Sequence, residues 1–94
     1  MATLLIRHRV RDYARWKAAF DAHAAERAAA GSLGGRVFRD GDDPEDVVVI
    51  LEWDDLDRAR DFAEREDLAP IMEGAGVLGE PEFLFLADVD RPGC

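Results

Sequence analysis

Cysteine, long apolar runs and positive charge are all scarce in this sequence, and each scarcity excludes a class of protein. Its 94 residues include one cysteine, Cys94, so neither an internal disulfide nor a cysteine-based metal site is expected. No stretch is long and apolar enough to cross a bilayer. The formal charge of −9 disfavours nucleic acids and anionic membrane surfaces as partners, because both would repel the chain. The apolar run near the start precedes the basic residues, which is the wrong order for a signal peptide, so a cytoplasmic protein is expected.

The residues that are present predict one α+β domain over 1–94, with a frayed tail at 89–94. Alternating and β-branched segments indicate strands, and Asp12, Asp54 or Asp55 and Gly31 are typical helix ends. The expected strands are Thr3–Val10, Arg36–Arg39, Asp46–Trp53 and Glu82–Ala87; the expected helices are Tyr13–Ala30 and Leu56–Arg65, with a further short helical segment at Leu68–Glu73. This βαββαβ order predicts the ferredoxin-like fold, an antiparallel four-stranded sheet with helices on one face and the first and third strands central.

The strand at 46–53 is apolar at nearly every position, which predicts that both of its faces are covered. The helices can cover only one face, so we expect the open face to pair with a second copy of the chain. Side-chain alternation places Arg7, Arg9, Val48, Ile50 and Glu52 on that open face. Glu52 is expected to pair with Arg7 or Arg9 on the adjacent strand or across the interface. A monomer with a partly apolar exposed face is the alternative.

A candidate small-molecule site lies on the inner side of the first helix. Helical spacing puts one apolar-to-polar stripe there, and His8 on the first strand faces it. The expected catalytic residues are His8 and His23, because a histidine with a pKa near neutrality can act as a general base. The expected pocket residues are Tyr13, Trp16, Phe20, Arg27, Trp53, Phe62 and Met72.

Each of these residues also has a purely structural interpretation. A histidine on an inward face is often a hydrogen-bonded core residue, and Trp16 and Phe20 have the spacing of core residues. Arg27 near a helix end can interact with the helix dipole. The acidic run at 40–46 lacks the spacing of a calcium loop and is expected to be a solvated turn, and no metal site is expected from the two histidines.

Three segments resemble the small dimeric α/β-barrel proteins, and within them the antibiotic-biosynthesis-monooxygenase-like group. They are residues 7–23 (RHRVRDYARWKAAFDAH), 41–53 (GDDPEDVVVILEW) and 54–63 (DDLDRARDFA), and the likeness extends over residues 2–89. The resemblance implies a homodimer whose two sheets form a barrel, with a pocket between helices and sheet in each subunit. For the monooxygenase members it implies oxidation of polycyclic phenols such as anthrones by oxygen, without metal or flavin cofactor.

The resemblance implies that three positions of this chain correspond to functional positions of the family. His8 stands near the place of a polar Asn on the first strand, Phe62 near that of a Trp on the second helix, and Met72 where haem-degrading members have a His. We therefore expect a cofactor-independent monooxygenase or cyclase acting on an aromatic or polyketide-like molecule. A non-catalytic small-molecule-binding or accessory homodimer is the alternative, and a small amino-acid-binding regulatory domain also stays open. An RNA-recognition module conflicts with the charge, and a copper-carrying domain with the missing cysteine pair.

Overall fold

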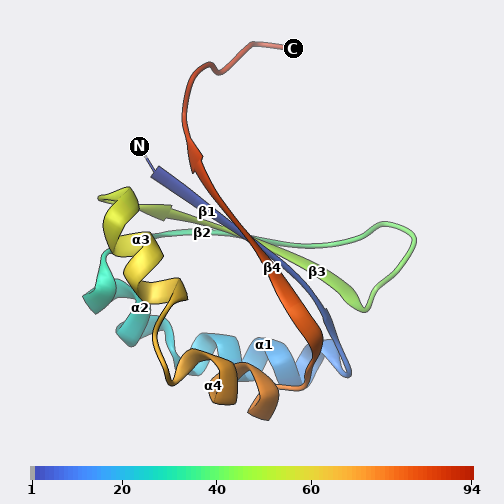
Figure 1. The fold of residues 1–94 in the computed structure, drawn as a ribbon. Helices are drawn as coiled ribbons and strands as arrows, with labels where there is room; N and C mark the ends of the chain where they lie inside the picture. The colour runs from blue at the N-terminus through green and yellow to red at the C-terminus, as the bar shows by residue number, and fades with distance from the viewer. Residues whose placement is uncertain (1) are drawn as a thin grey trace.

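The computed structural model describes residues 2–94 and contains four strands and four helices along that range (Figure 1). The strands are β1 (Ala2–Val10), β2 (Ser32–Arg39), β3 (Asp46–Trp53) and β4 (Val77–Ala87). The helices are α1 (Tyr13–Ala22), α2 (Ala24–Ala30), α3 (Leu56–Ala63) and α4 (Leu68–Gly74). No helix or strand covers residues 88–94, which extend away from the sheet.

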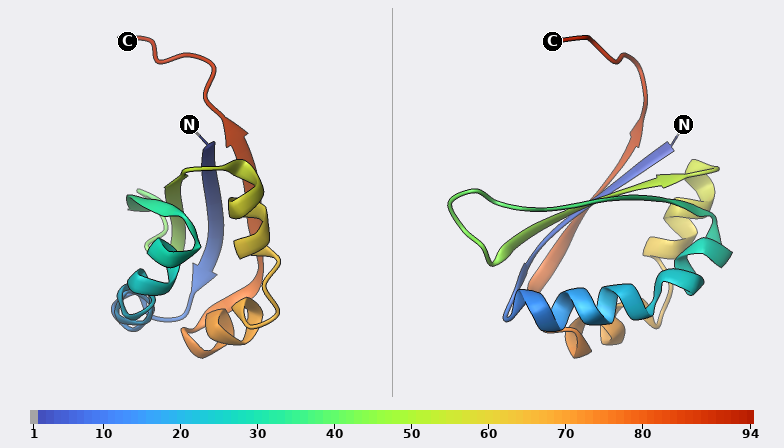
Figure 2. Two further views of the ribbon diagram at one scale, coloured as in Figure 1. Left: turned by 90° about the vertical axis from the view of Figure 1, so that its left-hand side faces the viewer. Right: turned by 180° about the vertical axis from the view of Figure 1, so that it is seen from behind.

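The strands form one antiparallel sheet in the order β2-β3-β1-β4, so the first and third strands are central. All four helices lie on one face of the sheet, and the opposite face carries none of them (Figure 2). The predicted ferredoxin-like α+β fold is therefore confirmed. In residues 2–94 no helix has the length and apolar character needed to span a membrane.

The core forms where the predicted side-chain alternation puts it. Leu4, Ile6 and Val10 of β1 are buried beneath the helices. The inward residues of β3, namely Val47, Val49, Leu51 and Trp53, are at most 4% exposed. Helices α1 and α3 begin at aspartate caps, because Asp12 and Asp55 accept hydrogen bonds from backbone N–H groups of the first turns. Strand alternation and helix capping together fix which residues face the helices.

The first helical segment is not the single helix predicted for residues 13–30. It breaks at His23, where the backbone leaves helical geometry and α2 begins at a different angle (Figure 2). Two side chains bind carbonyls at the break: the His23 ring bonds the Ala19 carbonyl, and the Arg27 guanidinium donates to the Phe20 carbonyl. The backbone N–H of His23 reaches back only three residues, to the Phe20 carbonyl, so the regular i→i+4 ladder is interrupted at this point.

Three strands begin earlier than predicted, β1 by one residue, at Ala2, and β2 and β4 by several. Strand β2 begins at Ser32 rather than Arg36, since Gly35 lets it approach β3 closely: a Cβ at this position would lie 1.9 Å from the Ile50 carbonyl oxygen. Strand β4 begins at Val77 rather than Glu82. Its register with β1 shifts between Arg7 and Arg9, which leaves Pro81 at an irregularity of an edge strand, where its missing N–H is tolerated.

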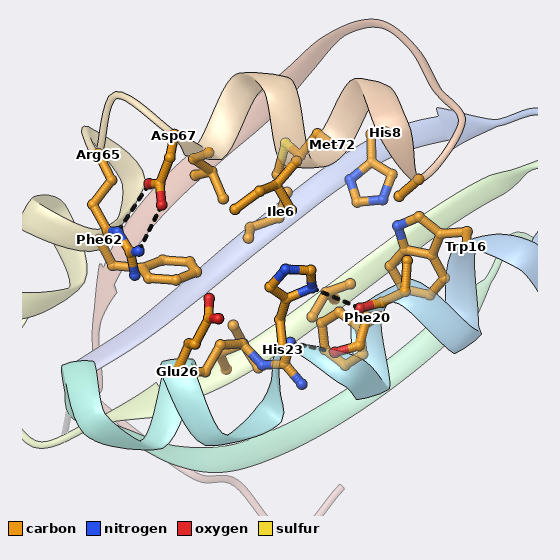
Figure 3. Close-up of a pocket in the computed structure, with 17 residues that line it drawn as sticks. Ile6, His8, Trp16, Phe20, His23, Glu26, Phe62, Arg65, Asp67 and Met72 are labelled. Atoms are coloured by element: carbon orange, nitrogen blue, oxygen red, sulfur yellow. Dashed lines mark hydrogen bonds and ion pairs between the residues drawn. The ribbon is translucent and has the colours of Figure 1, made fainter.

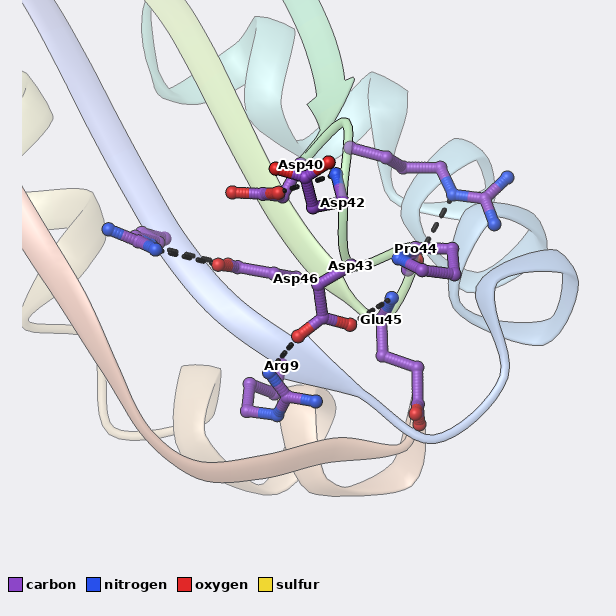
Figure 4. Close-up of polar contacts among 9 residues, drawn as sticks. Arg9, Asp40, Asp42, Asp43, Pro44, Glu45 and Asp46 are labelled. Carbon is purple, nitrogen blue, oxygen red and sulfur yellow. Dashed lines mark hydrogen bonds and ion pairs between the residues drawn. The ribbon is translucent and has the colours of Figure 1, made fainter.

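The charged residues of the open face pair differently from the prediction. Glu52 does not bind Arg7 or Arg9 within the chain but accepts a hydrogen bond from Thr3, its neighbour in the register. Arg7 binds Asp46 at 2.7 Å, and Arg9 binds Asp43 in the acidic turn (Figure 4). These partners lie near the turn because the β1–β3 register places Arg7 and Arg9 there and Glu52 at the opposite end.

Candidate functional site

A cavity of about 70 Å³ lies between the sheet and the ring of helices, where α1, α2, α3 and α4 meet over β1 and β3 (Figure 3). Apolar side chains supply most of its wall, with a few polar groups at one end and at the mouth. Its lining comprises Ile6, His8, Trp16, Ala19, Phe20, His23, Glu26, Arg27, Val49, Leu51, Phe62, Arg65, Asp67, Leu68, Ile71, Met72 and Ala75. Such an apolar hollow with a few convergent polar groups is typical of a small-molecule site.

His8 is the most unusual residue of this wall. Strand alternation turns it inward with Leu4 and Ile6, so its side chain is only 5% exposed. Neither ring nitrogen has a hydrogen-bond partner among the described residues, and the ring lies beside Trp16 with centroids 5.3 Å apart. Buried polar side chains are usually paired, so an unpaired imidazole facing a cavity is available to a ligand.

Burial also sets the protonation state of His8. Desolvation of the imidazolium lowers the pKa of His8 to about 4, and the charge of Asp46 offsets only part of this effect. The sequence suggested a histidine that titrates near neutrality, and the structure corrects this for His8. At pH 7 the ring is neutral, with one nitrogen able to donate and the other able to accept a hydrogen bond.

His23 projects into the middle of the cavity from the break between α1 and α2 (Figure 3). Its Nδ1 lies 2.8 Å from the Ala19 carbonyl oxygen. A carbonyl can only accept, so Nδ1 carries the proton when the ring is neutral and Nε2 keeps its lone pair. The helix break therefore fixes the tautomer of His23 and leaves Nε2 as an acceptor.

The mouth of the cavity carries charged residues that were not predicted from the sequence. Arg65 and Asp67 form an ion pair of 2.8 Å in the connection between α3 and α4, and Glu26 of α2 extends toward them and Phe62 (Figure 3). In the sequence these residues belong to charged segments that look like solvated surface. Arg65 and Asp67 line the cavity because the connection from α3 to α4 passes beside it, and this path cannot be predicted from the sequence.

Seven of the nine predicted site residues line the cavity, and two do not. Those that the fold brings together are His8, Trp16, Phe20, His23, Arg27, Phe62 and Met72. Tyr13 lies outside the wall, beneath the guanidinium of Arg39. Trp53 is fully buried and packs against Phe62 with ring centroids 5.2 Å apart, so it supports the wall without reaching the cavity. The functional roles of all nine remain predictions.

The acidic turn was expected to be solvated, and several of its carboxylates bind neighbouring groups. Asp40 and Asp43 accept hydrogen bonds from backbone N–H groups of the turn, and Asp43 also binds Arg9 (Figure 4). These contacts with Arg9 and the backbone lower the pKa of Asp43. Within the described part of the chain, no cluster of three or more His, Cys, Asp or Glu side chains is arranged to hold a metal ion.

Several solved structures match this chain closely in fold but share little sequence identity with it. A protein from Bordetella bronchiseptica named for antibiotic biosynthesis monooxygenases superposes with a TM-score of 0.78 at 17% identity, covering 94% of this chain and 96% of that one. SnoaB, a cofactor-independent oxygenase from Streptomyces nogalater, gives 0.71 at 23% identity, covering 97% and 96%. Rv0793 from Mycobacterium tuberculosis gives 0.68 at 16% identity, covering 96% of each chain.

No protein-family model and no curated protein matches the sequence. The structural matches cover almost the whole chain, and they confirm at the level of fold the resemblance to antibiotic-biosynthesis-monooxygenase-like proteins. The identities of 16–23% between this chain and the three structures do not carry a function from one protein to the other.

The lowered pKa of His8 predicts a specific loss of stability in mild acid. The unfolded chain binds a proton at this position near the ordinary histidine pKa of about 6.5, whereas the folded chain does so only near 4. The contribution of neutral His8 is therefore complete above pH 6.5 and is lost as the pH falls toward 4. Between pH 7 and pH 5 the free energy of unfolding should fall by about 2 kcal/mol more in the wild type than in His8→Leu.

Denaturant unfolding of both proteins at the two pH values measures this difference. The lowered pKa values of Asp43 and Asp46 also weaken the fold in acid, but both proteins share that loss, so it cancels. Equal pH dependence in the two proteins would mean that His8 is solvated or paired in the folded state.

Proposed function

We propose that this chain is a small-molecule tailoring enzyme that acts on an aromatic or polyketide-like substrate in the cavity, as a cofactor-independent monooxygenase or cyclase. The observation that carries the proposal is the imidazole of His8, buried and unpaired in an apolar wall. The fold shared with SnoaB, a cofactor-independent oxygenase, adds support. A cytoplasmic location stays a prediction from the sequence.

In the proposed reaction a histidine removes a proton from the substrate, and the carbanion that remains is electron-rich enough to react with oxygen. His8 has a free ring nitrogen at the sheet side of the cavity, and His23 offers Nε2 from the helix side. The carbanion of an anthrone-type substrate then gives an electron to O₂, and the two radicals combine to a peroxide anion, which takes the proton from the imidazolium. Loss of the second proton from the same carbon, together with cleavage of the O–O bond, leaves the quinone carbonyl. One oxygen atom enters the product, and the other leaves as water with the two protons that the carbon has lost, the first of them carried by the histidine.

The low basicity of His8 in the empty cavity fits this role only when the substrate is bound. A carbanion beside the imidazolium stabilises its charge, because opposite charges attract strongly where water is excluded. Proton transfer in the complex is therefore easier than the pKa of about 4 for the free protein implies. On this account the acid limb of kcat/KM, which reports the free protein, lies near pH 4 rather than near 6–7.

The cavity volume favours a small ligand or a mouth that adjusts. About 70 Å³ is well below the roughly 300–1,000 Å³ of common ligand pockets. Met72 on the short helix α4 lines the cavity, and its unbranched side chain changes rotamer easily. A polycyclic substrate therefore requires movement of Met72 and of the Arg65–Asp67 pair, whereas a single aromatic ring requires less.

A second candidate function, binding without turnover, is favoured by the pKa of His8. A neutral imidazole that holds a proton so weakly serves well as a hydrogen-bonding group for a neutral ligand and poorly as a base. In this alternative the dimer is an accessory protein that stores or presents an aromatic molecule. The two functions differ in turnover, which can be measured directly.

Oxygen uptake with an anthrone substrate distinguishes a monooxygenase from a protein that binds without turnover. At pH 7 the wild-type protein, freed of metal by chelation, should consume oxygen with saturation kinetics, and His8→Leu should lower kcat by roughly 100-fold or more, as expected for loss of a general base. Tyr13→Phe is the matched control, because Tyr13 lies outside the cavity wall, and it should retain wild-type uptake. Uptake that survives His8→Leu and disappears in His23→Leu would assign the base to His23. No saturable uptake by the wild type would refute the monooxygenase proposal.

The same proposal includes a homodimer formed through the open face of the sheet. The register aligns Ile50, Leu5 and Leu84 across three strands, and Val48 lies opposite Phe38. Phe38, Leu84 and Leu86 are 37–42% exposed, which is high for large apolar side chains clustered on one face. Pairing with a second copy would cover this patch, as the sequence predicts for the face that carries Arg7, Arg9 and Glu52.

Sedimentation equilibrium at micromolar concentration tests the dimer. The wild type should have twice the mass of the 10.5 kDa chain, and Leu84→Arg should shift it to the monomer by placing a charge in the patch. Val89→Arg is the control, because Val89 is 95% exposed and lies beyond β4. A wild-type monomer, or a dimer that both variants retain, would contradict this interface.

A further inference from the structure

Arg27 is a half-buried cation in the cavity wall without an acidic partner. It extends from α2, and no carboxylate among residues 2–94 lies within ion-pair distance of its guanidinium. Its contacts are an aromatic ring and a carbonyl: the guanidinium carbon lies 3.6 Å from the centroid of the Phe20 ring, and Nη1 donates to the Phe20 carbonyl at 2.6 Å. A guanidinium has several N–H donors, so most of those on Arg27 are left for a ligand.

The carboxylates nearest to Arg27 are directed elsewhere. Asp21 favours the charged form of Arg27 from a distance, but it binds Lys17 at 2.6 Å. Glu26 extends toward Phe62 and the Arg65–Asp67 pair, which is already joined (Figure 3). Desolvation consequently lowers the pKa of Arg27, although an arginine stays charged at neutral pH. A buried cation of this kind is stabilised when an anion binds it.

Arg27 also borders a second hollow, a groove between α2 and β2. The described walls of this groove include Phe20, Leu33 and Val37 and contain no aspartate or glutamate. That is unusual in a chain with a net charge of −9. Arg36 is part of the same wall, but its guanidinium lies over the Phe38 ring, 4.7 Å from the centroid, on the open face of the sheet. Arg27 is therefore the cation that both hollows share.

We infer that Arg27 determines specificity for an aromatic substrate bearing an anionic group, a carboxylate or a comparable oxyanion. The anion binds the free N–H groups of Arg27 where the cavity meets the α2–β2 groove, and the ring lies against Phe20 and His23. This inference rests on the proposed function, because it requires the cavity to bind an aromatic molecule. To the proposed function it adds two statements: the ligand carries a negative charge, and Arg27 is the residue that recognises this charge.

A matched pair of probe ligands tests the inference. Isothermal titration calorimetry at pH 7 compares 2-naphthoate, which is ionised, with 2-naphthamide, which has nearly the same shape and no charge. The wild type should bind 2-naphthoate at least about tenfold more tightly, as expected for a charge-assisted pair. Arg27→Gln should remove that preference by weakening the binding of 2-naphthoate much more than that of 2-naphthamide. Arg36→Gln, which removes another arginine stacked on an aromatic ring, should preserve the preference.

The outcomes distinguish this inference from the proposed function. Equal binding of the two ligands by the wild type, or an unchanged preference in Arg27→Gln, would overturn the role of Arg27 while leaving an aromatic-binding cavity. Binding of neither ligand would overturn both. Glu26→Gln supplies a further check, because removal of the only other charge that α2 contributes to the cavity should preserve or strengthen the preference for 2-naphthoate.

Discussion

The burial of an unpaired imidazole on the inner face of β1 is the constraint on which the rest of this account depends. Alternate side chains of a strand point to the same face, so His8 points toward the helices together with Ile6 and Val10. His8 is thereby desolvated without a hydrogen-bond partner in the described structure, an arrangement that costs free energy. Such a cost at the wall of a cavity is expected where a ligand, rather than the protein, completes the hydrogen bonds.

The helix side of the cavity depends on a second departure from regular structure. The His23 ring and the Arg27 guanidinium take the carbonyls of Ala19 and Phe20, and α1 ends where α2 begins. One break therefore fixes the tautomer of His23 and holds Arg27 over the Phe20 ring. The acceptor nitrogen of His23 and the free cation of Arg27 therefore both lie at the break between α1 and α2.

The sequence predicts the sheet order and the inward faces well, because alternation on β1 and β3 has a period of two and the aspartate caps are local signals. It fails at local departures from regular structure and where the path of the chain decides which residues meet. Nothing in the helical pattern of residues 13–30 marks His23 as a break. The double glycine at 34–35 looks like a loop, yet Gly35 allows β2 to approach β3. Most of the cavity wall follows from helical and strand spacing, whereas Arg65 and Asp67 join it only through the path of the chain between α3 and α4.

The most direct test of this account is an NMR titration of the two histidines in the folded protein, with ¹⁵N shifts to report the tautomers. His8 should titrate near pH 4, and His23 in its neutral form should carry its proton on Nδ1. His8→Leu assigns the two sets of signals. A His8 that titrates near its ordinary pKa of about 6.5 would mean that the ring is solvated, and the proposed role of a neutral, ligand-accessible imidazole in a dry cavity would be wrong.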